Sequence, residues 1–236
     1  MKVLIVGILL GSLMISTVLG LPRETAGIPQ QSLTGSDAAP PSQEDPSEDT
    51  LQRKVPGDEL EFLRTTDVFY ASLGRTRVPG GMVRLVDCEE DTLLQSWKPL
   101  GSPLSRVLDT MVVTDPRYIW KVQDGVVNLL PATGEPALLK TRLNEFHVED
   151  VSSARQALSW LLALPEVKKR MRDLHLKPGI AIIVDGSGLN PPKFSVKQKG
   201  GTLHQALNAI AFAQGNAIWE YIEIHCNGSN EVIIRF

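Results

Sequence analysis

Apolar residues recur with helical spacing in two segments of the chain. From Leu104 the next apolar positions follow three, four and seven residues later, and the same spacing begins again at Leu203. Such spacing places the apolar side chains on one face of a helix. Each predicted helix is followed by an apolar strand, a turn and a returning apolar strand, at 126–130 and at 231–236. The pattern therefore predicts the order helix, strand, strand twice.

The two segments are copies of one pattern. Adding 99 to the residue number takes Leu108 to Leu207 and Trp120 to Trp219. The leucines share a helical position and the tryptophans share a strand position, so we expect these four residues to be equivalent parts of a repeated core. Chance similarity of two amphipathic helices is the alternative interpretation.

Capping and turn residues support the boundaries of these elements. In the first copy Pro103 is predicted as the first helical residue, and the Asp-Gly pair at 124–125 predicts a tight hairpin turn. In the second copy Thr202 opens a capping-box pattern and Gly215 suits the C-terminal cap. The second hairpin is predicted to have a longer loop, at 225–230.

The segment at 146–158 is a partial repeat of the strand and helix start predicted at 194–207. Pro165 should kink the helix that follows or start a new one, because proline cannot continue a helix interior. A buried strand is expected at 180–184, where the residues are continuously apolar.

Ahead of the first copy, the apolar spacing from Leu60 to Val68 predicts a short helix. Two glycines should separate it from a strand at 82–86. Together the elements predict an α+β fold, in which tandem helix–strand–strand units form short mixed sheets packed on helices.

The N-terminal part of the chain has a different character. A positive charge followed by an apolar run at 1–20 is typical of an export signal peptide. Pro, Ser, Gln and acidic residues dominate 21–56, a composition that cannot bury enough apolar surface to fold. We therefore expect a signal peptide, a disordered linker, a first repeat region at 57–136 and a second α+β region at 137–236.

Composition and charge narrow the classes of partner. The net charge of -3 gives no positive surface of the kind that binds nucleic acid, so no nucleic-acid partner is expected. The most basic stretch, 168–172, is expected to be a solvated helix face, with an anion-binding patch as the alternative. The apolar run at 1–20 is short for a spanning helix, which favours a cleaved signal over an uncleaved anchor, the alternative. No other stretch is apolar enough to span a membrane, so the mature protein should lack a membrane span and be periplasmic or secreted.

The second copy also resembles a known family. Its order of strand, apolar-spaced helix, glycine and hairpin is similar to that of the small periplasmic N-terminal domains of secretins and TonB-dependent receptors. The matching positions are Phe194, Val196, Leu203, Ala206, Leu207, Ile210, Gly215 and Trp219. The resemblance extends over 104–236 as tandem copies, although the first copy has 114–116 where the glycine would stand.

The resemblance implies a protein-binding module without catalytic residues. We therefore expect an exported, non-catalytic protein-interaction module of the bacterial cell envelope, whose partner is another protein, an envelope component. The strands at 119–122 and 218–224 are the expected sheet edges, where an extended segment of the partner would add. A secreted hydrolase or a carbohydrate-binding protein with a site assembled from scattered residues is the alternative.

Residues with reactive side chains form no recognisable motif. Two combinations of Ser, His and Asp are available: Ser152, His147 and Asp150, or Ser187, His225 and Asp185. Neither serine lies in a nucleophile elbow, and the histidines and cysteines lack metal-site spacing. We predict no catalytic residue, no metal site and no cofactor. The four tryptophans at 97, 120, 160 and 219 could stack on a sugar, but the repeat positions of two of them favour core packing.

The chain has two cysteines. Cys88 ends an early predicted strand, and Cys226 lies in the loop of the last hairpin. An even number of cysteines in an exported protein, without metal-site spacing, favours a disulfide. We predict a Cys88–Cys226 bridge, with two free buried thiols as the alternative.

Overall fold

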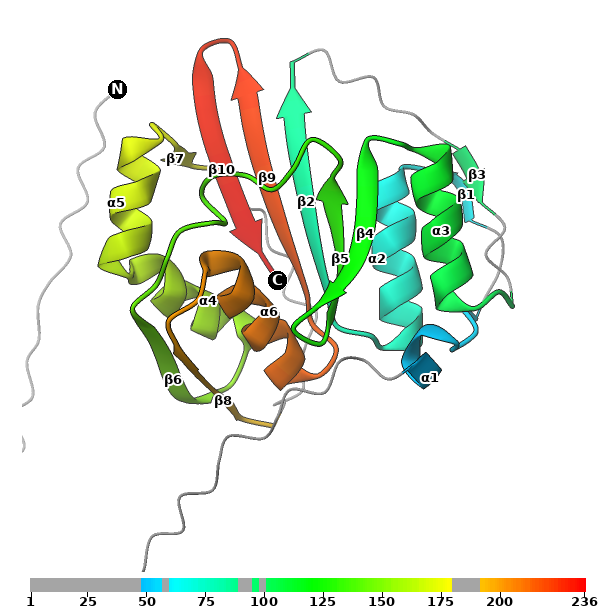
Figure 1. The fold of residues 1–236 in the computed structure, drawn as a ribbon, viewed down its shortest axis with the longest axis horizontal. Coiled ribbons are helices and arrows are strands. Elements are labelled where there is room, and N and C mark those ends of the chain that lie inside the picture. Colours follow the sequence, from blue (N-terminus) through cyan, green and yellow to red (C-terminus); the bar gives the residue numbers. More distant parts are fainter. Residues whose placement is uncertain (1–47, 57–59, 89–94, 98–100, 180–191) are drawn as a thin grey trace, which may run out of the picture. The chain divides into compact units, whose positions relative to one another are not determined.

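The computed structural model describes residues 48–56, 60–88, 95–97, 101–179 and 192–236 (Figure 1). The predicted signal peptide, most of the predicted linker and the strand predicted at 180–184 lie outside the described residues. The folded part begins before residue 57, because α1 (Glu48–Leu51) and a fully buried Val55 precede it. The amide of Val55 donates to the carbonyl oxygen of Ser102, 2.9 Å away. The end of the predicted linker therefore belongs to the fold.

A six-stranded mixed sheet is the centre of the fold. Its strands, in spatial order, are β4 (Tyr118–Gln123), β5 (Val126–Pro131), β2 (Gly80–Asp87), β9 (Ile218–Cys226), β10 (Ser229–Arg235) and β7 (Lys177–Pro178). β5, β2 and β9 run parallel, whereas β4 and β10 run antiparallel to their hairpin partners. Because β2 pairs with both β5 and β9, the regions predicted at 57–136 and 137–236 share one sheet.

Helices cover both faces of this sheet (Figure 1). α2 (Thr65–Thr76) and α3 (Leu104–Thr114) form one apolar cluster with it, and α4 (Ala154–Ala163) and α6 (Leu203–Gln214) form the other. Alternation along β2 divides the two clusters, since Met82 contributes to the first and Val83 to the second. The predicted α+β class is confirmed, with the sheet between two helical layers.

Two smaller antiparallel sheets complete the described part. β6 (Glu145–Val151) pairs with β8 (Phe194–Lys199). These strands lead into α4 and α6, as the partial repeat at 146–158 and 194–207 predicts. β1 (Leu60–Leu63) pairs with β3 (Gln95–Trp97). The helix predicted from Leu60 is therefore wrong at its start: those residues form a strand, and α2 begins after them.

Most predicted boundaries agree with the structure. The capping box at Thr202 and the left-handed cap at Gly215 are confirmed. α5 (Pro165–Asp173) begins at its proline, as a new helix. Two details differ: Pro103 is the N-cap of α3, not its first residue, and the second hairpin turns at 227–228 without the predicted long loop. Positive φ angles at both turn residues of each hairpin explain the tight turns.

The two helix–hairpin units lie on opposite faces of the sheet. α3 packs on the face that carries Trp120, and α6 packs on the face that carries Trp219. β4 and β9 run in opposite directions, because β9 is parallel to β5. One unit is therefore related to the other by a 180° rotation about an axis that lies in the sheet, perpendicular to the strands. A translation along that axis then takes β4, beyond β5 and β2, to the position of β9. Leu108 and Leu207 are both fully buried, each in the cluster on its own face.

Candidate functional site

Each tryptophan of the repeat is tied to its own helix by the same hydrogen bond. The indole nitrogen of Trp219 donates to Oδ1 of Asn208 at 2.9 Å, and that of Trp120 donates to Oδ1 of Asp109 at 3.0 Å. Asp109 and Asn208 also differ by 99 in number (208 − 109). The contact therefore repeats with the sequence. Trp219 is fully buried and Trp120 half-buried, so the contact is shielded from solvent more completely in the second copy.

The indole of Trp219 lies against Gly81 on the neighbouring strand. A Cβ atom added to Gly81 would overlap the indole ring and also the side-chain oxygen of Asn128 on β5. The sequence suggested that the two glycines separate a helix from a strand, but they are the first two residues of β2. A glycine here allows close approach of an aromatic ring to the strand backbone.

Gly81→Ala should lower the free energy of unfolding by about 1–3 kcal/mol, because a fully buried indole leaves no room for the extra methyl group. Gly74→Ala is the matched control. Gly74 lies exposed in α2 with open space around its Cα, and alanine there should stabilise by up to about 1 kcal/mol. Urea denaturation of both variants measures the two changes, and a loss of stability of equal size in both would contradict the packing at Gly81.

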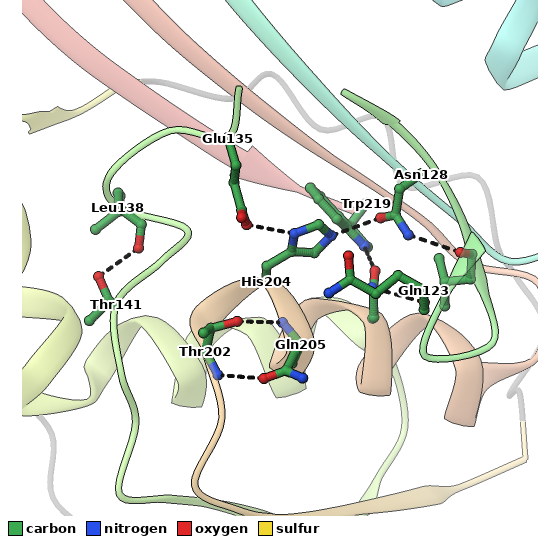
Figure 2. A network of polar contacts seen from close by, with 11 residues as sticks. Gln123, Asn128, Glu135, Leu138, Thr141, Thr202, His204, Gln205 and Trp219 are labelled. Atoms are coloured by element: carbon green, nitrogen blue, oxygen red, sulfur yellow. Dashed lines mark hydrogen bonds and ion pairs between the residues drawn. The ribbon is translucent and has the colours of Figure 1, made fainter. Parts of the chain in front are cut away.

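A buried histidine joins the second copy to the first (Figure 2). His204 lies in the first turn of α6, with Nδ1 2.6 Å from Oε1 of Glu135 and Nε2 2.9 Å from Oδ1 of Asn128. The amide nitrogen of Asn128 donates to the Val126 carbonyl, which leaves its oxygen free to accept from the ring. The imidazole edge also meets Trp219, with ring centroids 5.1 Å apart and planes at 77°.

The charge of Glu135 is favoured by its neighbours. Burial by itself raises the pKa of this carboxyl, but the hydrogen bond from His204 and electrostatic attraction to His204, Lys121 and Lys140 outweigh it, so the pKa lies below its usual value. Glu135 therefore accepts from the imidazole as a carboxylate. The partners of His204 are thus a carboxylate and an amide. We interpret the network as a polar link that fixes α6 against β5 and the loop after it.

Among the described residues, the combination of Ser152, His147 and Asp150 is not assembled, because its members have other partners. His147 Nε2 lies 2.9 Å from Glu149, and the Ser152 hydroxyl donates to Gln156. His225 contacts Glu223 and Asn230. Ser187 and Asp185 lie outside the described residues. Nor do the repeat tryptophans form one platform, because Trp120 and Trp219 face opposite sides of the sheet.

Cys88 and Cys226 are joined in a disulfide, with Cα atoms 5.0 Å apart. β2 and β9 are neighbouring parallel strands whose last pair is Asp87 with His225. The cysteines stand one position further along both strands. The bridge therefore continues the strand pairing at the end of β2.

β4 forms one edge of the central sheet. Within the described part of the chain its only strand partner is β5. Ile119 on this strand is 48% exposed. The prediction that 218–224 forms another edge is wrong, because β9 lies between β2 and β10. The residues of one hairpin do not show that a further strand pairs with it, so the interior position of β9 could not be predicted from them.

A pocket of about 480 Å³ opens between α5 and the loop that follows β5. Glu135 lines it, so the buried histidine network reaches its wall. No group of three or more His, Cys, Asp or Glu side chains suited to a metal ion occurs in the described ranges. None of the helices that the structure describes is both long and apolar enough to cross a membrane.

Comparison of the chain with known protein families, with curated proteins and with solved structures found no match. The resemblance to secretin and receptor N-terminal domains therefore stays a prediction.

Proposed function

We propose that the chain is an exported, non-catalytic protein-interaction module of the bacterial cell envelope, which binds an extended segment of another envelope protein along β4. The observation that carries the proposal is the outer side of this edge strand, with which no other described strand pairs. An unpaired strand edge offers a row of main-chain donors and acceptors that a second chain can pair with.

The register of the β4–β5 hairpin indicates which groups are available. Gln123 and Val126 flank the two-residue turn, so they form a hydrogen-bonded pair. Such pairs alternate along an antiparallel ladder, which directs the main-chain groups of Trp120 and Val122 away from β5. These two residues offer two donors and two acceptors to an added strand.

The opposite end of the sheet is a poorer docking edge. β7 has two residues, Lys177 and Pro178. A proline has no amide hydrogen, and so short a strand gives little length for pairing. An added strand is therefore better accommodated at β4.

Export is supported by two features. The first twenty residues have the pattern of a signal peptide. The Cys88–Cys226 disulfide is compatible with an oxidising compartment, because reducing compartments keep most thiols free.

Proline at Val122 tests the proposed edge. Val122→Pro removes an amide that faces away from β5, so the sheet should form while partner capture falls about fivefold or more, the effect of losing one hydrogen bond of about 1 kcal/mol. The measurement is the amount of envelope partner retained by equal amounts of immobilised folded protein. Val122→Ala controls for the lost side chain and should retain the partner.

Ile222→Pro is the matched control for strand position. Ile222 lies in β9, where it faces Arg84 on one side and Ile233 on the other, so proline there should unfold the protein. If Val122→Pro folded and retained the partner as well as the wild type does, the proposed edge would be wrong.

A further inference from the structure

We propose that the pocket between α5 and the loop after β5 binds a small anion with at least two negative charges, of the phosphate or dicarboxylate class. This site is separate from the β4 edge and does not depend on a partner binding there. The pocket is lined by Glu135, Ala137, Lys140, Thr141, Arg142, Glu166, Lys169, Arg170 and Asp173. Its volume of about 480 Å³ falls within the range of small-molecule sites in proteins.

One face of α5 forms a wall of the pocket. Glu166, Lys169, Arg170 and Asp173 follow one another at helical spacing of three, four and seven residues. The other wall is the loop from Glu135, part of which is drawn in Figure 2. Two segments from different parts of the fold therefore direct charged side chains into one space.

The acidic side chains of the pocket are mostly engaged by other groups. Glu135 accepts from His204, and Glu166 accepts from the side-chain amide of Asn144 at 2.7 Å. Asp173, the last residue of α5, is the remaining carboxylate. These hydrogen bonds fix the positions of the two glutamates without removing their formal charges.

The basic side chains are not engaged in the same way. In the part of the chain that the structure describes, no ion pair joins Lys140, Arg142, Lys169 or Arg170 to a carboxylate. The lining carries four cations and three carboxylates, so its formal charge is +1. Guanidinium groups bind phosphate and carboxylate through paired hydrogen bonds, and ammonium groups add charge. Four cationic donors around one space, with a net positive charge, are suited to a phosphate or dicarboxylate anion.

In the structure, the basic residues of 168–172 fall into two pairs with different surroundings. Lys169 and Arg170 line the pocket, whereas Lys168 and Arg172, on the same helix, do not. The solvated-face interpretation thus fits one pair of residues and the anion-binding interpretation fits the other. This division supplies a matched pair of variants.

Isothermal titration of the exported chain with inorganic pyrophosphate and with citrate tests the site. Lys169→Gln with Arg170→Gln should weaken binding about tenfold or more, because each removed charge-assisted hydrogen bond contributes more than a neutral one. Lys168→Gln with Arg172→Gln removes the same charge from the same helix and should change the affinity less than about twofold. Lys140→Gln with Arg142→Gln, on the loop, should reproduce the loss if the α5 variant fails to fold.

The two probes distinguish phosphate from carboxylate recognition, because the probe that binds more tightly identifies the class of anion that the pocket prefers. Binding of either probe with a loss confined to the lining variants supports the proposal. Wild-type affinity weaker than about 1 mM for both probes would overturn it, and so would equal weakening in the lining and control pairs, which would indicate a general charge effect.

Discussion

Replacing Leu207 with alanine should lower the free energy of unfolding by about 2–5 kcal/mol, and Leu108→Ala should do the same. Both side chains are fully buried in helices, Leu207 in the cluster with Trp219 and Leu108 in the cluster on the opposite face. Truncation removes apolar contacts and leaves a cavity that closely packed neighbours cannot fill. Chemical denaturation of each variant measures the loss.

Val113→Ala is the control for these leucines. Val113 is near the end of α3 and 81% exposed, so its truncation should change stability by less than about 0.5 kcal/mol. Because Leu108 and Leu207 lie in different clusters, the double variant should lose the sum of the two single losses within about 0.5 kcal/mol. A loss below about 1 kcal/mol at either leucine would contradict the repeated core.

Removing the disulfide should have a comparably large effect. Cys88 and Cys226 are separated by 138 residues, and closing so long a loop reduces the conformational freedom of the unfolded chain. Replacing both with serine should lower the free energy of unfolding by about 3–5 kcal/mol. Denaturation of both proteins without reductant measures the difference.

Reductant supplies the control for the disulfide. It should destabilise the wild-type protein to about the level of the serine variant and leave the variant itself unchanged. Labelling of both cysteines in the unreduced, unfolded wild-type protein would show free thiols and contradict the bridge.

Local signals explain what could be predicted from the sequence. The helix that begins at Leu203 is marked by its apolar spacing, by the capping box at Thr202 and by Gly215, and each of these acts within a few residues. The hairpin at 124–125 is fixed by its turn residues in the same way. These signals need no knowledge of the remaining chain, so they predicted the order of elements in both copies.

Strand order depended on contacts that no local signal encodes. β2 separates the two hairpins, and its insertion places β9 inside the sheet while β4 stays at the edge. Leu60–Leu63 forms a strand because β3 pairs with it, against its helical spacing. Pairing between distant segments decided both cases.

The polar network was equally non-local. His204 meets Glu135 and Asn128, which lie 69 and 76 residues away in the chain. The hydrogen bonds of the two indoles, by contrast, had a signal in the sequence. Asp109 and Asn208 differ by the repeat offset, and both have side chains that can accept from an indole. The pocket offered none, because Lys140 and Lys169 come together only through packing of α5 on the loop.

Hydrogen–deuterium exchange of β4, in the free protein and in the complex with its envelope partner, tests the central claim most directly. In the free protein the outward amides of Trp120 and Val122 should exchange rapidly, because none of the described strands covers them. On binding, these two amides should become protected while those of β9, already paired on both sides, stay unchanged. Protection that falls on another surface and leaves the β4 amides exchanging as before would contradict the proposed docking edge.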